Sequence, residues 1–417
     1  MIGIFKLNDY MKSKIRNCKW FQMVGMSVLA IMLCTQVALA QNISKQQDTL
    51  KIDPAPFADN ANHWYGIYDK HNIINPLPDR PRYKPTEIKN IGDNILLFQK
   101  NNGGWAKNYD VFAILSNDQK DSIRTKCNDV NTTFDNGTCY TQIAALTIVY
   151  NATKDEKYKK GILRGLDYLL EAQYGNGGWP QFYPLETDYS RHITYNDGAM
   201  EGVMELLKDI LDNKNTKYSF LDGKIIKKIQ TAFEKGLDCI IKTQIKDDGK
   251  LTAWCQQHDE VTLEPAWARK FEPACICSSE SAWLVLFLMS IDHPSKVIID
   301  AIQNATAWFE ASKIYNIRVD RIQAPPLVTP YKTSTTDKVV VVDSAAPPIW
   351  TRYYELKTHR PLFCNRDSKL VYSLAEVARE RRDGYAWYNY TPQKVLDAYP
   401  AWQKKWTPYN SVLSKKN

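Results

Sequence analysis

The sequence lacks the signatures that would point to nucleotide or Ser-His chemistry. It has no phosphate-binding Walker loop, no dinucleotide-binding glycine fingerprint and no Gly-x-Ser-x-Gly elbow. It also has no EF-hand loop. The six histidines stand singly along 417 residues, which gives little support to a histidine-centred mechanism. The chemistry must therefore be sought in carboxylates, arginines and aromatic side chains.

Long apolar runs and clusters of basic residues are scarce as well. Residues 1–40 contain a basic lead (Lys12 to Lys19), an apolar run (residues 21–33) and a small-residue cleavage site (residues 38–40, ALA), which is typical of a secretory signal peptide. That run is short for a membrane span, and no later run is long enough. We therefore expect a secreted or periplasmic protein with no membrane span.

The basic charge of the chain comes largely from this leader. Residues 1–40 hold five basic residues and one acidic residue, so their removal lowers the formal net charge from +8 to +4. Lys and Arg form no long clustered run in the remainder. We expect no nucleic-acid partner and a monomeric protein, whereas an acidic polymer remains compatible as a substrate.

Seven cysteines remain after residue 40, and their spacing matches no zinc motif. The pair in Cys275-Ile276-Cys277 is too close for a CxxC knuckle. Two interpretations stay open, namely some disulfides of undeducible pairing or buried free thiols.

A pattern repeats at roughly seventy residues from Ile88 onward. Each copy has a helix that ends in a glutamine, then a glycine loop, then a tryptophan. The three pairs are Gln99 and Trp105, Gln173 and Trp179, and, more loosely, Gln244 and Trp254.

Each loop is followed by an apolar helix and then by an amphipathic helix. The apolar helices are expected at residues 143–150, 200–211 and 283–291, and the amphipathic ones at 158–173, 225–244 and 295–312. This alternation indicates an inner ring of helices inside an outer ring. The sequence therefore predicts a mainly α fold, an α/α toroid or incomplete barrel of helical hairpins, with long loops.

Three further segments complete the predicted organisation. Residues 41–85, rich in Pro and Asn, are expected to form an extended N-terminal arm with regular helix only after it, and residues 86–417 the catalytic domain. The β-branched run from Val339 to Val342 predicts a short strand in a small β-containing subregion. A final short helix is expected near residues 392–399.

Acidic residues precede the three apolar helices. In a toroid the inner helices begin at one end, so Asp135, Asp197 and Glu280 would converge at one mouth. The same mouth would hold the loop tryptophans Trp105, Trp179 and Trp254. A single acid there is usually an N-cap or first-turn residue, but three in register beside aromatic loops favour a shared cleft.

The residue types at this mouth allow two chemistries. Asp135 and Asp197, with the amides of Asn136 and Asn196, form an oxygen-rich set suited to a hard cation such as calcium. The same carboxylates could instead be the acid and base of a glycoside hydrolase.

Arginines in loop-like, aromatic-flanked stretches favour an acidic sugar chain. Arg269, Arg352 and Arg366 offer the planar donors that a substrate with a carboxylate on every ring needs. Each alone is more often a structural ion-pair partner.

Several motifs together resemble the pectate lyases of polysaccharide lyase family 10, from about Ile88 to Trp402. They are residues 102–108 (NGGWAKN), 134–138 (FDNGT), 177–184 (GGWPQFYP), 192–200 (HITYNDGAM), 257–259 (QHD), 265–269 (PAWAR), 350–356 (WTRYYEL), 360–361 (RP), 366–367 (RD) and 380–388 (ERRDGYAWY).

The resemblance implies an α/α toroid that cleaves polygalacturonate by calcium-assisted β-elimination. By the matching motifs, Arg269 would abstract the C5 proton, and the metal-binding residues would be Asp135 and Asp197 with Asn136 beside them. The implied substrate-binding residues are Lys107, Arg352 and Arg366. His258, as a histidine beside an aspartate, is a further candidate for a substrate contact. Two alternatives remain at this point, a glycoside hydrolase that uses Asp135 and Asp197 and an exported protein that binds pectin without cleaving it.

The chain departs from the family pattern at its cysteines. Cys275 and Cys277 occupy a stretch expected to be small and polar, and Cys364 also stands where a small residue is expected. Glu280 receives no catalytic role from the resemblance.

Overall fold

The computed structural model describes residues 50–66, 74–330 and 333–413. The expected signal peptide, residues 1–40, lies outside the described residues. The chain divides into two units, one of residues 1–53 with 84–88 and one of residues 54–83 with 89–417. In the first unit, the Ile52 backbone N–H donates to the Pro85 carbonyl oxygen at 3.0 Å. The description below concerns the second unit.

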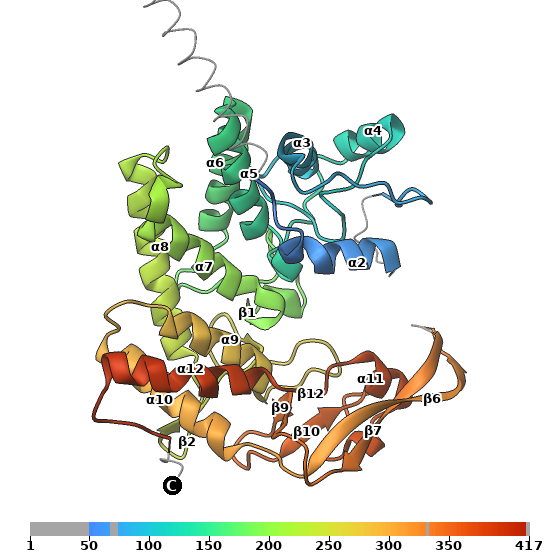
Figure 1. The fold of residues 1–417 in the computed structure, drawn as a ribbon, viewed down its shortest axis with the longest axis vertical. Coiled ribbons are helices and arrows are strands. Elements are labelled where there is room, and N and C mark those ends of the chain that lie inside the picture. Colours follow the sequence, from blue (N-terminus) through green and yellow to red (C-terminus); the bar gives the residue numbers. More distant parts are fainter. Residues whose placement is uncertain (1–49, 67–73, 331–332, 414–417) are drawn as a thin grey trace, which may run out of the picture. The chain divides into compact units, whose positions relative to one another are not determined.

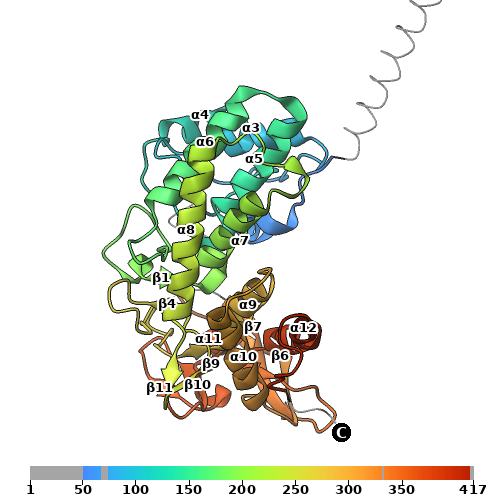
Figure 2. The ribbon, with the colours of Figure 1, turned by 90° about the vertical axis from the view of Figure 1, so that its left-hand side faces the viewer.

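Three helical hairpins form the centre of the second unit. They are α5 (Tyr140–Thr153) with α6 (Glu156–Glu171), α7 (Ala199–Asp212) with α8 (Gly223–Lys242), and α9 (Ser278–Met289) with α10 (Lys296–Ala311). The first helices contact one another in the order α5, α7, α9, and the second helices in the order α6, α8, α10 (Figures 1 and 2). The predicted mainly α fold of α/α toroid type is thereby confirmed.

The helices begin where their sequences supply caps and apolar faces. Asp155, Asp222 and Ser295 are the N-caps of α6, α8 and α10, and each side chain accepts a hydrogen bond from a backbone N–H in the first turn. These second helices bury a single face, whereas α5 and α9 bury side chains all around. None of the helices in the described part of the chain has the length and apolarity that a bilayer-spanning helix needs.

The repeated glutamine joins each outer helix to the next. Gln99 Nε2 donates to the Gly161 carbonyl oxygen in α6 at 2.9 Å, and Gln173 Nε2 donates to that of Ala232 in α8 at 2.8 Å. Gln244 Nε2 makes the third such bond, to Ala301 in α10, at 3.1 Å. One amide per repeat therefore fixes the spacing of the hairpins.

The loop tryptophans are core residues, so their predicted place at the mouth is wrong. Trp105, Trp179 and Trp254 are fully buried. Each indole N–H donates to a carbonyl near the end of the preceding helix, at Ile95 (2.8 Å), Leu169 (2.9 Å) and Ile240 (2.7 Å). A buried indole needs one acceptor, and the last carbonyls of a helix lack intrahelical donors, so the pairing satisfies both.

A fourth copy of this contact escaped the sequence pattern. Trp350 is fully buried, and its indole N–H donates to the Phe309 carbonyl oxygen of α10 at 2.9 Å. No glycine loop precedes Trp350 in the sequence, which is why the repeat was not visible there.

Glycine is required in two of the repeated loops. Gly103 and Gly177 have φ angles of +93° and +96°, and a Cβ atom would lie 2.3 Å from the Arg164 oxygen and 2.0 Å from the Lys235 oxygen, respectively. Both the backbone conformation and the close approach to the next outer helix exclude a side chain.

The N-terminal arm is not extended throughout, contrary to the prediction. The short 3₁₀ turn Ala55–Phe57 leads into α2 (Ala58–Gly66). Asn60 of α2 is buried and donates from Nδ2 to the Asn136 carbonyl oxygen at 2.7 Å, and its Oδ1 accepts from the Asn108 backbone N–H at 2.7 Å. Tertiary contacts therefore stabilise a helix that the Pro- and Asn-rich composition disfavours.

The C-terminal part contains more strand than predicted. Strands β6 (Ile317–Val328) and β7 (Thr333–Val342) pair antiparallel with Ile317 opposite Val342, and the pairing is irregular between Gln323 and Leu327, where Pro325 and Pro326 lie (Figure 1). The predicted strand 339–342 is thus the end of the longer strand β7. Its partner β6 tolerates the proline pair because the pair lies at the irregularity. Helix α12 (Thr391–Trp406), longer than expected, packs on α9 and α10.

Short strands connect this part to the hairpins. A four-stranded sheet has the order β11 (Leu370–Val371), β10 (Pro361–Cys364), β9 (Tyr353–Tyr354), β5 (Ile276–Cys277), and β12 (Tyr388–Asn389) pairs with β8 (Trp350–Thr351). Strand β1 (Ile193–Thr194) pairs with β4 (Gln257–His258), and β2 (Lys246–Asp247) with β3 (Lys250–Leu251). The other helices are α3 (Ile88–Phe98), α4 (Asn117–Thr125) and α11 (Arg379–Gly384), the last of which contacts β7.

Candidate active site

One polar cavity of about 340 Å³ brings together most of the predicted site residues. The predicted residues that line it are Lys107, Asp135, Asn136, Asp197, Arg269 and Arg352. They come from segments up to 245 residues apart in the sequence, so the fold, rather than any local motif, assembles the site.

A repeated backbone bond sets the register of the acidic turns. The N–H groups of Thr133, Thr194 and Cys277 donate to the carbonyl oxygens of the three loop tryptophans at 3.0, 3.1 and 2.7 Å. Two residues beyond these donors stand Asp135, Asn196 and Ser279, and three residues beyond stand Asn136, Asp197 and Glu280. Asp135 and Asp197 therefore occupy successive positions of the repeat, not equivalent ones.

Two matching turns present these carboxylates. The 3₁₀ turns η2 (Asp135–Gly137) and η4 (Asn196–Gly198) contact each other. Each has a left-handed residue in its centre, Asn136 with φ 54° and Asp197 with φ 53°. Asn and Asp accept this conformation more readily than most residues, which explains the Asn/Asp-Gly composition of both turns.

The turns carry more oxygen acceptors than the protein satisfies. Asp135 Oδ1 and Asn196 Oδ1 are buried without a hydrogen-bond partner, and only Oδ2 of Asp135 is engaged, by Lys107 Nζ at 2.9 Å. Asp197 is open to the cavity but enclosed by the surrounding elements, and this enclosure together with the Asp135 carboxylate raises its pKa to about 6. Unpaired oxygens and two repelling carboxylates fit a hard divalent cation.

Arg269 is bound to a buried acid that the sequence did not single out. Its Nε donates to Glu272 Oε2 at 2.8 Å and its Nη2 to Glu272 Oε1 at 2.5 Å. Tyr385 also donates to Glu272, at 2.9 Å. Burial disfavours the charged guanidinium, but the hydrogen bonds and charge of Glu272 outweigh it, so the pKa of Arg269 lies above its ordinary value.

Arg352 is held by the third acid of the repeat. Its Nη2 donates to Glu280, and its guanidinium lies 4.8 Å from the centre of the Tyr385 ring. Burial acts against the charged form, but Glu280 and the surrounding groups outweigh it and raise the pKa of Arg352 well above the ordinary value. Glu280 thus has the role of orienting a permanently charged arginine at the cavity.

Two predicted substrate-binding residues are not in the lining. His258 is fully buried, its Nε2 accepts the Cys255 backbone N–H at 3.1 Å, and its Nδ1 lies 2.9 Å from the Leu263 carbonyl oxygen. Both ring nitrogens of His258 thus lie within hydrogen-bond distance of the backbone, and its role as a substrate contact stays a prediction. Arg366 does not line the cavity but pairs with Glu380 at 2.8 Å and lies 5.1 Å from the ring centre of Phe271, over which Arg269 also lies.

Other lining residues were missed by the sequence reading. Glu272, Tyr385 and Tyr189 surround Arg269, and Asp59 and His63 reach the cavity from α2. The three-residue spacing of Arg269 and Glu272 was an available signal for an ion pair. The sequence offered no signal for the α2 residues, because their segment was predicted to be an extended arm.

Comparison with known proteins agrees with this site. A family model described as pectic acid lyase matches residues 99–396. The solved structure of a family 10 polysaccharide lyase from Cellvibrio cellulosa shares 28% sequence identity and a TM-score of 0.62, covering 75% of this chain and 91% of that chain. A mutant of the Cellvibrio cellulosa family 10 enzyme, in complex with trigalacturonic acid, shares 25% identity and a TM-score of 0.63, covering 84% and 98%. No curated protein matches the chain.

The toroid and its arginine- and carboxylate-lined cavity, with these matches, define a polysaccharide lyase. Because the family model covers most of the chain, the protein belongs to the pectic acid lyase family.

Proposed function

We propose that the protein is a secreted pectate lyase that cleaves α-1,4-polygalacturonate, the acidic chain of pectin, to 4,5-unsaturated oligogalacturonides by calcium-assisted β-elimination. The observation that carries the proposal is the presence of Arg269 and Arg352 in the same cavity as Asp135 and Asp197. Cationic donors for a uronate carboxylate thus face an oxygen-rich set for a hard cation. The trigalacturonic acid bound by the Cellvibrio relative supports the substrate class.

Asp135 and Asp197, with Asn136 at the centre of its turn, are the residues that would hold calcium. The unpaired Oδ1 of Asp135 and the raised pKa of Asp197 support this assignment. A calcium ion bound there would withdraw negative charge from the C6 carboxylate of the substrate and so acidify the C5 proton.

Arg352 and Lys107 are proposed to bind the uronate carboxylate. Glu280 holds Arg352 from one side, so its fork keeps a fixed direction into the cavity. Lys107 pairs with Asp135 at 2.9 Å and lines the same cavity, so its ammonium lies beside the turn that is proposed to bind the metal. Arg366, over the same Phe271 ring as Arg269, is proposed to bind a carboxylate of the same chain further along.

Arg269 is the proposed base. Glu272 engages Nε and Nη2, and Nη1 is the nitrogen outside that pair. We propose that neutral Arg269 removes the C5 proton through Nη1, that the C5–H electron pair forms the C4–C5 double bond, and that the C4–O bond breaks. The leaving oxygen then takes a proton from water. Arg352 stabilises the enolate-like charge that develops on the carboxylate.

The Glu272 pair makes the neutral guanidine a minor species, so activity is expected to rise with pH above neutral. A carboxylate stabilises the protonated guanidinium, and its removal lowers the pKa. Glu272→Gln should therefore move the rising limb of the kcat/KM profile, where Arg269 loses its proton, to lower pH by about one to three units. This shift is expected whatever happens to the maximal rate. The measurement is the pH profile of initial rates on polygalacturonate.

Glu355→Gln is the matched control. Glu355 also pairs with an arginine, Arg360, at 3.1 Å, and does not line the cavity. Its profile should stay unchanged. If the rising limb of the kcat/KM profile of Glu272→Gln lies at the same pH as in the wild type, the deprotonation of Arg269 does not limit the rate.

Product masses separate the lyase from the two alternatives. Purified protein is incubated with trigalacturonate and longer oligogalacturonides, and the masses of the products are measured by mass spectrometry. β-Elimination gives one fragment that is lighter by one water than the hydrolysis product. Fragments with the hydrolysis masses alone would establish a hydrolase, and bound but uncleaved substrate would establish a pectin-binding protein.

A further inference from the structure

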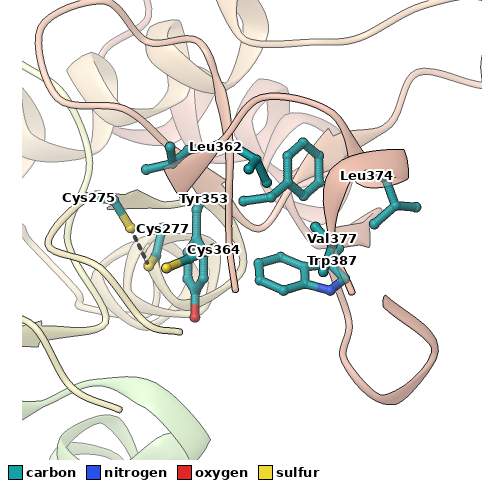
Figure 3. Packing of buried hydrophobic residues seen from close by; sticks show 10 residues of the cluster. Cys275, Cys277, Tyr353, Leu362, Cys364, Leu374, Val377 and Trp387 are labelled. Carbon is teal, nitrogen blue, oxygen red and sulfur yellow. Dashed lines mark hydrogen bonds between the residues drawn. The ribbon is translucent and has the colours of Figure 1, made fainter. Parts of the chain in front are cut away.

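Three cysteine sulfurs lie close together in the core. Cys255, Cys275 and Cys277 are fully buried, and their Sγ atoms all lie within 4.8 Å of one another. The Sγ atoms of Cys275 and Cys277 are 3.8 Å apart and point toward each other (Figure 3). The structure describes all seven cysteines after residue 40 and contains no disulfide among them, so the disulfide interpretation of the sequence is not adopted.

The separation of these sulfurs suits a shared ion better than a sulfur–sulfur bond. Two thiolates bound at about 2.3 Å to one tetrahedral ion lie about 3.8 Å apart. Cys275 stands immediately before β5 and Cys277 is in it, and residues two apart along a strand are about 6.6 Å apart between Cα atoms. That span is near the upper end of the range for disulfides.

The three thiols shift one another's pKa values. Burial raises the pKa of Cys275 and Cys277 well above the ordinary thiol value, and the nearby Cys255 raises it further. Burial acts in the same direction on Cys255, but hydrogen bonds from the other two thiols and the charge of His258 outweigh it and lower its pKa. The three thiols therefore interact as one group, with His258 beside them.

The cluster lies at the base of the loop that carries the proposed catalytic arginine. Residues 256–274 leave Cys255 and return to Cys275, and Gln257, Arg269 and Glu272 within this loop line the active-site cavity. A bond between the two ends would restrict the loop without touching the substrate.

We propose that Cys255, Cys275 and Cys277 bind one thiophilic cation, Zn²⁺ or Cu⁺, through three thiolates. Thiolate sulfur selects these ions over calcium, so the site is chemically separate from the carboxylate turns of the cavity. Binding releases the thiol protons to solvent and changes no oxidation state. The bound ion closes residues 256–274 at their base and holds Arg269 and Glu272 in place. The proposal does not depend on lyase activity.

Cadmium titration tests the site directly. The full chain is purified under inert gas without chelators, and Cd²⁺ is added while the ultraviolet charge-transfer band of cadmium–thiolate bonds is recorded. Carboxylate-bound cadmium gives no such band. In the wild type the band should saturate at one equivalent of Cd²⁺. In Cys255→Ser the affinity for Cd²⁺ should be lower by at least about tenfold. Cys239→Ser, a single buried cysteine in α8, should behave like the wild type.

Competition assays then identify the ion, with a zinc indicator in one arm and a Cu⁺-selective chromophore under anaerobic conditions in the other. Retention of either ion at one equivalent supports the proposal. No thiolate band in folded wild-type protein would overturn it, and this result needs no variant to fold. A thiolate band of the same affinity in Cys255→Ser would overturn it as well. So would a disulfide among the three cysteines, detected by mass spectrometry of the alkylated protein.

Discussion

Replacing Arg269 with lysine is expected to lower kcat on polygalacturonate by about 10³-fold, within the usual range for loss of a general base. Lysine keeps a positive charge but loses the planar fork through which Glu272 engages Nε and Nη2 at 2.8 and 2.5 Å. Its single ammonium would turn toward Glu272, away from the C5 proton. KM should change far less, because Arg352 still binds the carboxylate. Initial rates over a range of substrate concentrations separate the two parameters.

Arg318→Lys is the control for this change. Arg318 also holds carboxylates through its fork, those of Asp320 at 2.9 Å and Asp343 at 2.7 Å, but lies on β6 and does not line the cavity. Its kinetics should match the wild type. Turnover close to the wild-type value in Arg269→Lys would remove Arg269 from the role of base.

Replacing Asp197 with asparagine is expected to lower activity by about 10² to 10³-fold and to leave the residual activity insensitive to chelators. A cation that polarises the substrate contributes several kcal/mol, and the substitution would remove one of the two anionic ligands proposed for it while keeping the shape of the turn. The fold should not suffer. Enclosure by the surrounding elements and the Asp135 carboxylate raise the pKa of Asp197 to about 6, so at neutral pH its charge is disfavoured in the folded state, and a neutral amide relieves that repulsion. Thermal melting measures whether the stability of the fold is kept.

Asp209→Asn provides the comparison for Asp197→Asn. Asp209 lies on α7, where it accepts hydrogen bonds from Lys217 at 2.6 Å and from Tyr218 at 2.9 Å, and does not line the cavity. Activity and chelator sensitivity should be unchanged in this variant. Unaltered chelator sensitivity in Asp197→Asn would place the metal elsewhere.

The sequence was sufficient for the toroid because its signal is periodic. Six helices of alternating character recur at a regular spacing, and burial follows that character in α5, α6, α8, α9 and α10. The glutamine in each turn could be recognised as repeated, but its partner in the next outer helix lies about sixty residues away and could be found only in the structure.

The sequence misplaced the aromatic residues because composition does not distinguish a groove from a core. Trp105 and Trp179 stand beside flexible-looking glycines, yet these glycines bring the loop onto the next helix and bury the ring. The burial of His258 was hidden for a similar reason, since a histidine beside an aspartate in the sequence can equally well hydrogen-bond to the backbone.

The site was predictable where a motif carried it and hidden where folding assembled it. Asp135, Asp197, Arg269 and Arg352 were found from family motifs and do line one cavity. Glu272 and the α2 residues were not found, because ion-pair partners and a helix in a proline-rich arm depend on tertiary contacts. The meeting of Cys255 with Cys275 across a loop is of the same kind.

The most direct test of the account is the ultraviolet absorbance of purified protein acting on polygalacturonate at alkaline pH, with and without a calcium chelator. The account predicts steady growth of the band of a conjugated unsaturated uronide, loss of that growth with chelator and its return when calcium is added in excess. New reducing ends without this absorbance would contradict β-elimination at this site.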